Sequence, residues 1–120
     1  MDRAVAIEVS KLGKVYDGLT AIADLSFQVF AGEIFGLLGP NGAGKSTTLR
    51  ILITVVRPTT GHATVFGHDV TTETDRVRSL IGYVPQERAI DRFLTGREHL
   101  LLLGALYHLP KHETVRRIEE

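Results

Sequence analysis

An α/β fold is predicted for this chain of 120 residues by three features of its sequence. Apolar and polar side chains alternate in the first third, a short apolar run leads into a glycine-rich loop, and helix signals dominate the last third. The length suits one small domain or part of a larger one. Because the sequence contains no cysteine, a disulfide framework and a thiol nucleophile are excluded.

The first third of the chain is predicted to form β-strands. Apolar side chains alternate over residues 4–9 and again over residues 25–29, as expected of strands with one buried face. Tyr16, Asp17 and Gly18 form a turn signal between them. Residues 34–38 are an unbroken apolar run around Gly36, which is typical of a strand buried on both faces.

The glycine-rich loop is followed by a predicted helix over residues 45–55, because this stretch lacks Gly and Pro. Its apolar side chains Leu49, Leu52 and Ile53 share one face. Short strands are predicted around Gly67.

Three further elements are predicted after residue 70. The acidic stretch at residues 72–75 begins a helix that runs to about Leu80, and a short strand over residues 81–84 follows. Thr95 and Glu98 form a capping box at the start of an apolar helix. Another helix is predicted to begin at Pro110.

Residues 39–46 carry the motif that indicates chemistry, since they match G-x-x-x-x-G-K-[ST] at every fixed position. Backbone amides of such a loop can converge on phosphate oxygens, and the next helix turns its N-terminal amides and positive dipole end toward them. Lys45 would add a positive charge at the β- and γ-phosphates, and the Ser46 hydroxyl could ligate magnesium. The predicted binding residues are Gly39, Pro40, Asn41, Gly42, Ala43, Gly44, Lys45, Ser46 and Thr47.

Two other interpretations of this motif are weaker. The first is a glycine-rich turn with an unrelated lysine, but a chance match to the motif has a probability of only about 0.005 over the chain. A dinucleotide fingerprint starting at Gly42 would need Gly or Ala at position 47, where this chain has Thr47.

The segment 39–47, GPNGAGKST, resembles the Walker A motif of ABC-type ATPases, and other motifs of that family surround it in the same order. Residues 25–27 and 32–39 are similar to the family's approach to the loop, and residues 81–87 resemble its Q-loop. The resemblance covers about residues 7–110. It implies a P-loop NTPase fold, an ABC-type nucleotide-binding domain with an antiparallel β subdomain, a P-loop strand and helix, and the start of a helical subdomain.

The resemblance also suggests roles for two residues outside the loop. An aromatic side chain at the place of Tyr16 stacks on adenine in this family, whereas the sequence alone is equally consistent with a packed rim aromatic. Gln86 would take the place of the Q-loop glutamine, whose carbonyl can ligate magnesium or orient a water. Together with Lys45, Gln86 is therefore expected to be catalytic.

The family's other catalytic motifs are missing from this sequence, which has no Ser-Gly-Gly triplet and no Asp-Glu pair. Residues 1–120 are therefore predicted to be the N-terminal part of a single ABC domain whose C-terminal part is absent. We expect the chain alone to bind nucleotide weakly and to hydrolyse it negligibly, because it lacks a general base. Without flanking parallel strands, the core positions Phe35, Leu37, Leu49 and Leu52 are expected to be exposed.

The resemblance implies partners as well as ligands. The cofactors would be ATP and magnesium. The partners would be a membrane-spanning transporter subunit, reached through the Q-loop region, and a second ATP-binding domain. Residues 94–98 and 106–110 are most similar to the antibiotic or multidrug exporter branch, which implies a cytoplasmic protein held at the membrane by its partner. A formal charge of zero gives no reason to expect nucleic-acid binding. A soluble ABC ATPase without a transport role and a non-catalytic nucleotide-binding fragment remain alternatives.

Overall fold

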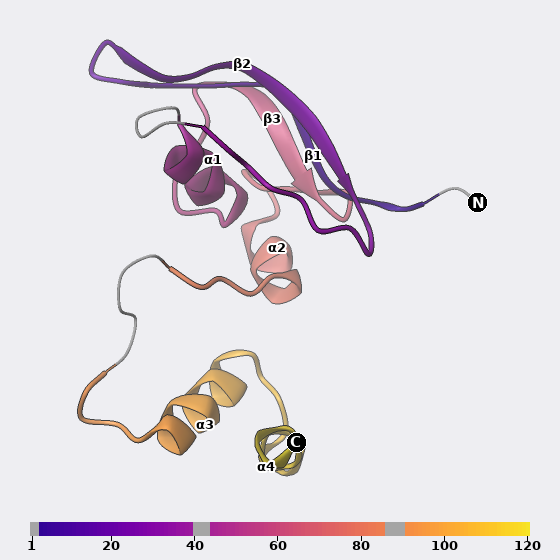
Figure 1. The fold of residues 1–120 in the computed structure, drawn as a ribbon, viewed down its shortest axis with the longest axis vertical. Coiled ribbons are helices and arrows are strands. Elements are labelled where there is room, and N and C mark those ends of the chain that lie inside the picture. The colour runs from indigo at the N-terminus through magenta and orange to yellow at the C-terminus, as the bar shows by residue number, and fades with distance from the viewer. Residues whose placement is uncertain (1–2, 40–43, 86–90) are drawn as a thin grey trace. The chain divides into compact units, whose positions relative to one another are not determined.

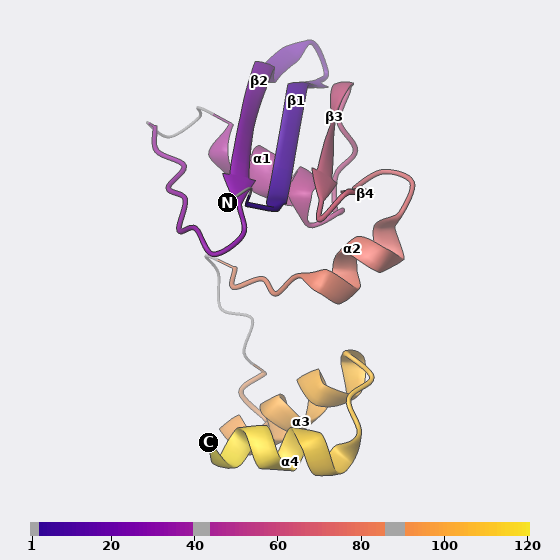
Figure 2. The same cartoon turned by 90° about the vertical axis from the view of Figure 1, so that its right-hand side faces the viewer.

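The computed structural model describes residues 3–39, 44–85 and 91–120, and these residues divide between two compact units, Met1–Gly82 and Tyr83–Glu120. Figures 1 and 2 show the elements of both units in two views related by a quarter turn.

The first unit is built on a four-stranded antiparallel sheet with the strand order β2-β1-β3-β4. Its strands are β1 (Val5–Tyr16), β2 (Leu19–Phe30), β3 (Thr60–Val65) and β4 (His68–Asp69). The long β1–β2 hairpin turns at residues 17–18, where the sequence predicts a turn. The sheet confirms the antiparallel β subdomain expected from the sequence, although both strands of the hairpin are longer than the alternating pattern indicates.

Helix α1 (Lys45–Leu52) lies against one face of this sheet, and α2 (Thr74–Leu80) follows β4 (Figure 2). The core forms where the sheet meets α1, α2 and the loop after β4, since the side chains that meet there are apolar and excluded from water. Its buried members are Val9, Leu12, Ile22, Ile51, Leu52, Ala63, Val65, Val70 and Val77.

The buried face of α1 differs from the predicted one. Thr47, Thr48, Ile51 and Leu52 are buried, whereas Leu49 is 45% exposed. The expected exposure is therefore confirmed for Leu49 and wrong for Leu52. Thr48 can be buried because its hydroxyl donates to the carbonyl oxygen of Gly44 at 2.8 Å, so that no polar group is left unpaired.

Two predicted strands are absent from the described residues: residues 34–38 and 81–84 have no strand assignment. A strand is defined by backbone pairing with a neighbour, and the ladders of the described sheet involve only β1 to β4. The prediction of a P-loop strand over residues 34–38 is therefore wrong for the described structure. As expected for an unpaired segment, Ile34, Phe35 and Leu38 are exposed, while Leu37 is partly buried.

The second unit contains α3 (Gly96–Leu106) and α4 (Lys111–Glu119), which pack against each other (Figure 2). The predicted capping box is confirmed: the amide of Glu98 donates to Thr95 Oγ1 at 3.1 Å, and the amide of Thr95 donates to Glu98 Oε1 at 2.9 Å. The two helices approach closely at Gly104 and Thr114, since a Cβ at position 104 would lie 2.3 Å from Thr114 Oγ1.

In the part of the chain that the structure describes, no helix combines the length and the apolar character needed to cross a membrane.

Candidate functional site

The start of α1 is shaped by Gly44, which caps the helix in the left-handed region with φ 84°. A side chain would not fit there, because a Cβ at this position would lie 2.4 Å from the carbonyl oxygen of Ala21. Only glycine combines this dihedral with such close packing against β2. The backbone therefore enters α1 in the manner that the glycine-rich motif predicts.

Lys45 is the first residue of α1, and its ammonium group donates a hydrogen bond to the carbonyl oxygen of Gly39. The two described ends of the motif, Gly39 and Gly44–Lys45, are therefore held together by the side chain of the lysine. The ammonium group lies at the helix N-terminus, where the free amides and the helix dipole also carry positive charge. Such an end favours an anionic ligand.

The next two residues of the motif differ in exposure. Ser46 is exposed, so its hydroxyl is accessible to a ligand or a metal ion. Thr47 is only 9% exposed, which leaves its backbone amide in the first helical turn as the group that could reach a ligand. The following amide, that of Thr48, is already engaged, since it donates to Gly44 O at 2.9 Å.

Tyr16 ends β1 and is paired with Leu19 across the hairpin turn. It is 40% exposed, so its ring is neither core nor fully solvated. The Lys14 ammonium group lies over the ring, 5.0 Å from its centroid. The motifs do not predict this contact, although residues two apart on a strand share a face, so that the spacing of Lys14 and Tyr16 is compatible with it.

One residue of β2 links this hairpin end to the start of α1. Ile22 is the register partner of Lys14, and its Cγ1 would lie 3.0 Å from a Cβ at Gly44. Ile22 itself is 6% exposed and belongs to the core. Ile22 therefore pairs with Lys14 of β1 and packs against Gly44 at the start of α1.

Five predicted site residues lie outside the described residues: Pro40, Asn41, Gly42, Ala43 and Gln86. The predicted Q-loop segment is described only up to Pro85. The predicted site residues that the structure describes are thus Tyr16, Gly39 and Gly44–Thr47, and among them the Lys45 side chain brings Gly39 to the start of α1.

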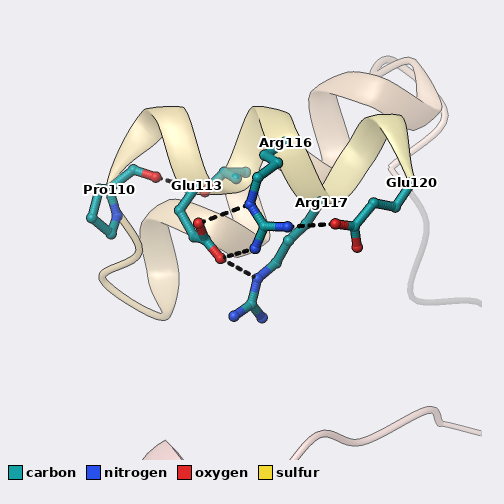
Figure 3. Close-up of polar contacts among 6 residues, drawn as sticks. Pro110, Glu113, Arg116, Arg117 and Glu120 are labelled. Carbon is teal, nitrogen blue, oxygen red and sulfur yellow. Dashed lines mark hydrogen bonds and ion pairs between the residues drawn. The ribbon is translucent and has the colours of Figure 1, made fainter.

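Among the described residues, the carboxyl groups with a displaced pKa belong to α3 and α4 or to the residue before α2, and none belongs to α1. Hydrogen bonds from Arg116 and then Arg117 lower the pKa of Glu113 to about 2 (Figure 3). The hydrogen bond with His68 is the main cause that lowers the pKa of Glu73, and the Thr95 amide does the same for Glu98. Glu73 binds back to β4, Glu98 belongs to the capping box of α3, and Glu113 forms ion pairs within α4. Within the described ranges, no cluster of three His, Cys, Asp or Glu side chains could hold a metal ion.

Comparison with known proteins agrees with this geometry. Residues 22–120 match the family described as ABC transporter. The daunorubicin/doxorubicin resistance ATP-binding protein DrrA of Streptomyces peucetius is 54% identical over 101 residues, which cover 84% of this chain and 31% of that protein. The Nod factor export ATP-binding protein I of Sinorhizobium fredii is 44% identical over 109 residues, which cover 91% of this chain and 32% of that protein. The chain thus spans about a third of the length of these relatives.

Solved structures show the same similarity. A structure described as the ATP binding subunit of an ABC transporter superimposes with a TM-score of 0.84 and 33% identity, covering 93% of this chain and 47% of that one. A bacterial Atm1-family ABC exporter with ATP bound gives a TM-score of 0.63 and 32% identity over 72% of this chain and 15% of that one. With matching sequence motifs, family model and fold, this chain belongs to the ABC transporter family.

Proposed function

We propose that this chain is the nucleotide-binding segment of an exporter's ATP-binding subunit. The observation that carries the proposal is the start of α1, where left-handed Gly44 opens the helix and the Lys45 ammonium group crosses to Gly39. This arrangement gathers positive charge and amide donors at one point, as the binding of a triphosphate requires.

Each residue of the proposed site has its own role. Lys45 binds the β- and γ-phosphates, and a phosphate oxygen replaces the Gly39 carbonyl as its acceptor. Ser46 is exposed and supplies a hydroxyl oxygen, which suits magnesium because this hard cation prefers oxygen ligands. Thr47 acts through its amide, and Tyr16 stacks on the base. Pro40, Asn41, Gly42 and Ala43 complete the loop around the phosphates, and Gln86 is the second proposed magnesium ligand and catalytic residue.

Hydrolysis by this chain alone is proposed to be negligible. Attack of water on a phosphoryl group needs a residue that orients or deprotonates the water, in addition to charge neutralisation. The sequence has no Asp-Glu pair to provide such a base and no Ser-Gly-Gly signature. We propose that these parts belong to a C-terminal portion of the domain that residues 1–120 do not include.

In the complete protein, ATP binding and hydrolysis would drive transport by a membrane-spanning partner that docks on the region around Gln86. A second ATP-binding domain would complete the site as a dimer, and the assembly would lie on the cytoplasmic side of the membrane. The names of the relatives support this proposal, since they describe ATP-binding proteins of drug resistance and of Nod factor export.

The test is calorimetric titration of the purified chain with MgATP. Lys45→Ala removes a charged hydrogen-bond donor, which is expected to weaken binding about 10- to 100-fold. Lys111→Ala, which removes an exposed lysine at the start of α4, is the matched control and is expected to leave affinity unchanged. Equal affinity of the wild-type chain and Lys45→Ala would overturn the nucleotide site. Steady ATP turnover that Lys45→Ala abolishes would overturn the claim of negligible hydrolysis.

A further inference from the structure

Lys14 connects the Tyr16 ring to the loop that follows α1. Its ammonium group lies 5.0 Å from the ring centroid and also donates a hydrogen bond of 2.8 Å to the carbonyl oxygen of Arg57. The ring contact alone could shift with rotation of the lysine side chain, but the second bond fixes where the ammonium group lies. The carbonyl group of Arg57, which lies outside the β1–β2 hairpin, therefore helps to hold the ammonium group over the ring.

The backbone near Arg57 is itself attached to β1. The amide of Val15 donates to Thr59 Oγ1 at 3.0 Å, and the amide of Thr59 donates to Gly13 O at 2.8 Å. The acceptor for Lys14 thus belongs to a segment that two further hydrogen bonds hold beside the strand. This segment leads away from α1, so Lys14 connects the Tyr16 ring to the loop at the C-terminal end of that helix.

A half-exposed aromatic ring at a strand end can rotate, and ordering it when a ligand binds costs free energy. A cation over one face lowers that cost because the ring is already held before the ligand arrives. It also leaves a single face for stacking, since the ammonium group occupies the other.

We propose that Lys14 is a positioning residue that preorganises Tyr16 to stack on the base of a nucleoside triphosphate. The inference rests on the proposed function, in which Tyr16 contacts the base. It assigns to Lys14 a contribution to affinity that depends on the base, whereas Lys45 contributes through the phosphates. Lys14 itself touches neither the phosphates nor the base.

The first experiment compares two probes, MgATP and inorganic triphosphate, which has no base. Lys14→Met keeps the length of the side chain and removes the charge, so we expect it to weaken ATP binding about two- to fivefold and to leave triphosphate binding unchanged. Lys14→Arg keeps a cation and a donor and is expected to restore ATP affinity. Lys11→Met removes another lysine of the same strand and is the matched control.

A double-mutant cycle separates positioning from a general structural effect. In a Tyr16→Leu background, Lys14→Met should change ATP affinity no further, because there is no ring left to hold. Equal losses in both backgrounds would overturn the proposal. So would unchanged ATP affinity in Lys14→Met while Lys45→Ala still weakens binding, and in that case the proposed function would survive alone.

Nuclear magnetic resonance of the free chain provides a readout without nucleotide. The Lys14 ε-protons are expected to be shifted upfield by the Tyr16 ring and to show cross-relaxation with its protons. Tyr16→Leu should abolish both signals. Their absence from the wild-type chain would overturn the inference, and absence of any ATP or triphosphate binding would overturn the proposed function together with it.

Discussion

The backbone at residue 44 decides how the chain enters α1. Two features of this residue disfavour a side chain. Its φ is 84°, and an added Cβ would lie only 2.4 Å from the carbonyl oxygen of Ala21. A Gly-to-Ala change is tolerated where the backbone is unstrained and no atom lies close. At Gly44 the cost of the left-handed dihedral and the cost of the close contact are both present. Gly44 is therefore a structural requirement as well as part of the proposed phosphate site.

We predict that Gly44→Ala lowers the free energy of unfolding of the first unit by at least about 1–2 kcal/mol, because alanine is strained in the left-handed region. The carbonyl of Ala21 must also move to admit the methyl group. The urea midpoint, followed by circular dichroism, measures the loss. Nucleotide affinity should fall as well, since the amides at the start of α1 are displaced.

Gly82→Ala is the matched control for this prediction. A Cβ at Gly82 would meet no atom within 4 Å, and this glycine is not among those with positive φ. Its urea midpoint should stay within experimental error of the wild-type value. A similar midpoint for both variants would show that Gly44 is not strained.

At the scale of elements, local signals were sufficient for the helices. Both α3 and α1 begin at short-range features of the sequence. For α3 this feature is the capping box of Thr95 and Glu98, and for α1 it is the left-handed glycine at position 44. The buried face of α1 was not predictable from periodicity, because residues 48, 51 and 52 satisfy the same spacing as 49, 52 and 53. The hydroxyl bond that allows Thr48 to be buried is visible only in the structure.

The strands show the opposite case. Residues 34–38 and 81–84 have strand-like composition, yet neither is paired among the described residues. Pairing depends on a neighbour that is distant in sequence, and composition carries no information about whether that neighbour is present. The phosphate loop, in contrast, was recognisable because its chemistry needs fixed residue types at fixed spacing.

Helix α4 provides a prediction about pH. Glu113 accepts hydrogen bonds from Arg116 and Arg117, and Arg116 also contacts Glu120 (Figure 3). Folding lowers the Glu113 pKa from 4.5 to about 2. The stabilisation is therefore complete above pH 4.5 and is lost as the pH falls toward 2, because protonation removes the acceptor. The helical Cα chemical shifts of α4 should decrease over this range.

A pair of glutamine variants isolates this effect from other carboxyl groups. Glu113→Gln should remove most of the pH dependence of the α4 shifts above pH 2 and reduce helicity at neutral pH. Glu119→Gln is the control, since Glu119 forms no ion pair among the described residues. An unchanged titration of α4 in Glu113→Gln would contradict the assignment to Glu113.

At the scale of the whole molecule, apolar burial is unevenly distributed. Within the described part of the chain, every buried core side chain falls between Val9 and Val77, whereas α3 and α4 bury only Gly104 and Thr114. Leu100 and Leu106 remain exposed. A unit of fewer than about 40 residues rarely folds stably without a disulfide, a metal or a partner.

We therefore predict that the second unit opens more readily than the first. Backbone amides of α3 and α4 should exchange with solvent at least about tenfold faster, after correction for intrinsic rates, than those of the central strand β1. Hydrogen exchange followed by nuclear magnetic resonance on the whole chain measures this difference. Equal protection in both units, with a single unfolding transition, would show that the chain is one cooperative unit.

The exposed segment over residues 34–38 has a consequence for how the chain behaves at high concentration. Ile34 and Leu38 are almost fully accessible, and this run of five residues contains no charge and no proline. Such a segment can recruit a second chain by backbone pairing, which leads to aggregation. Glu33 and Pro40 flank the run in the sequence and are residue types that oppose this self-association. A strand that paired with residues 34–38 would therefore also remove this route to aggregation, because it would occupy the free backbone groups.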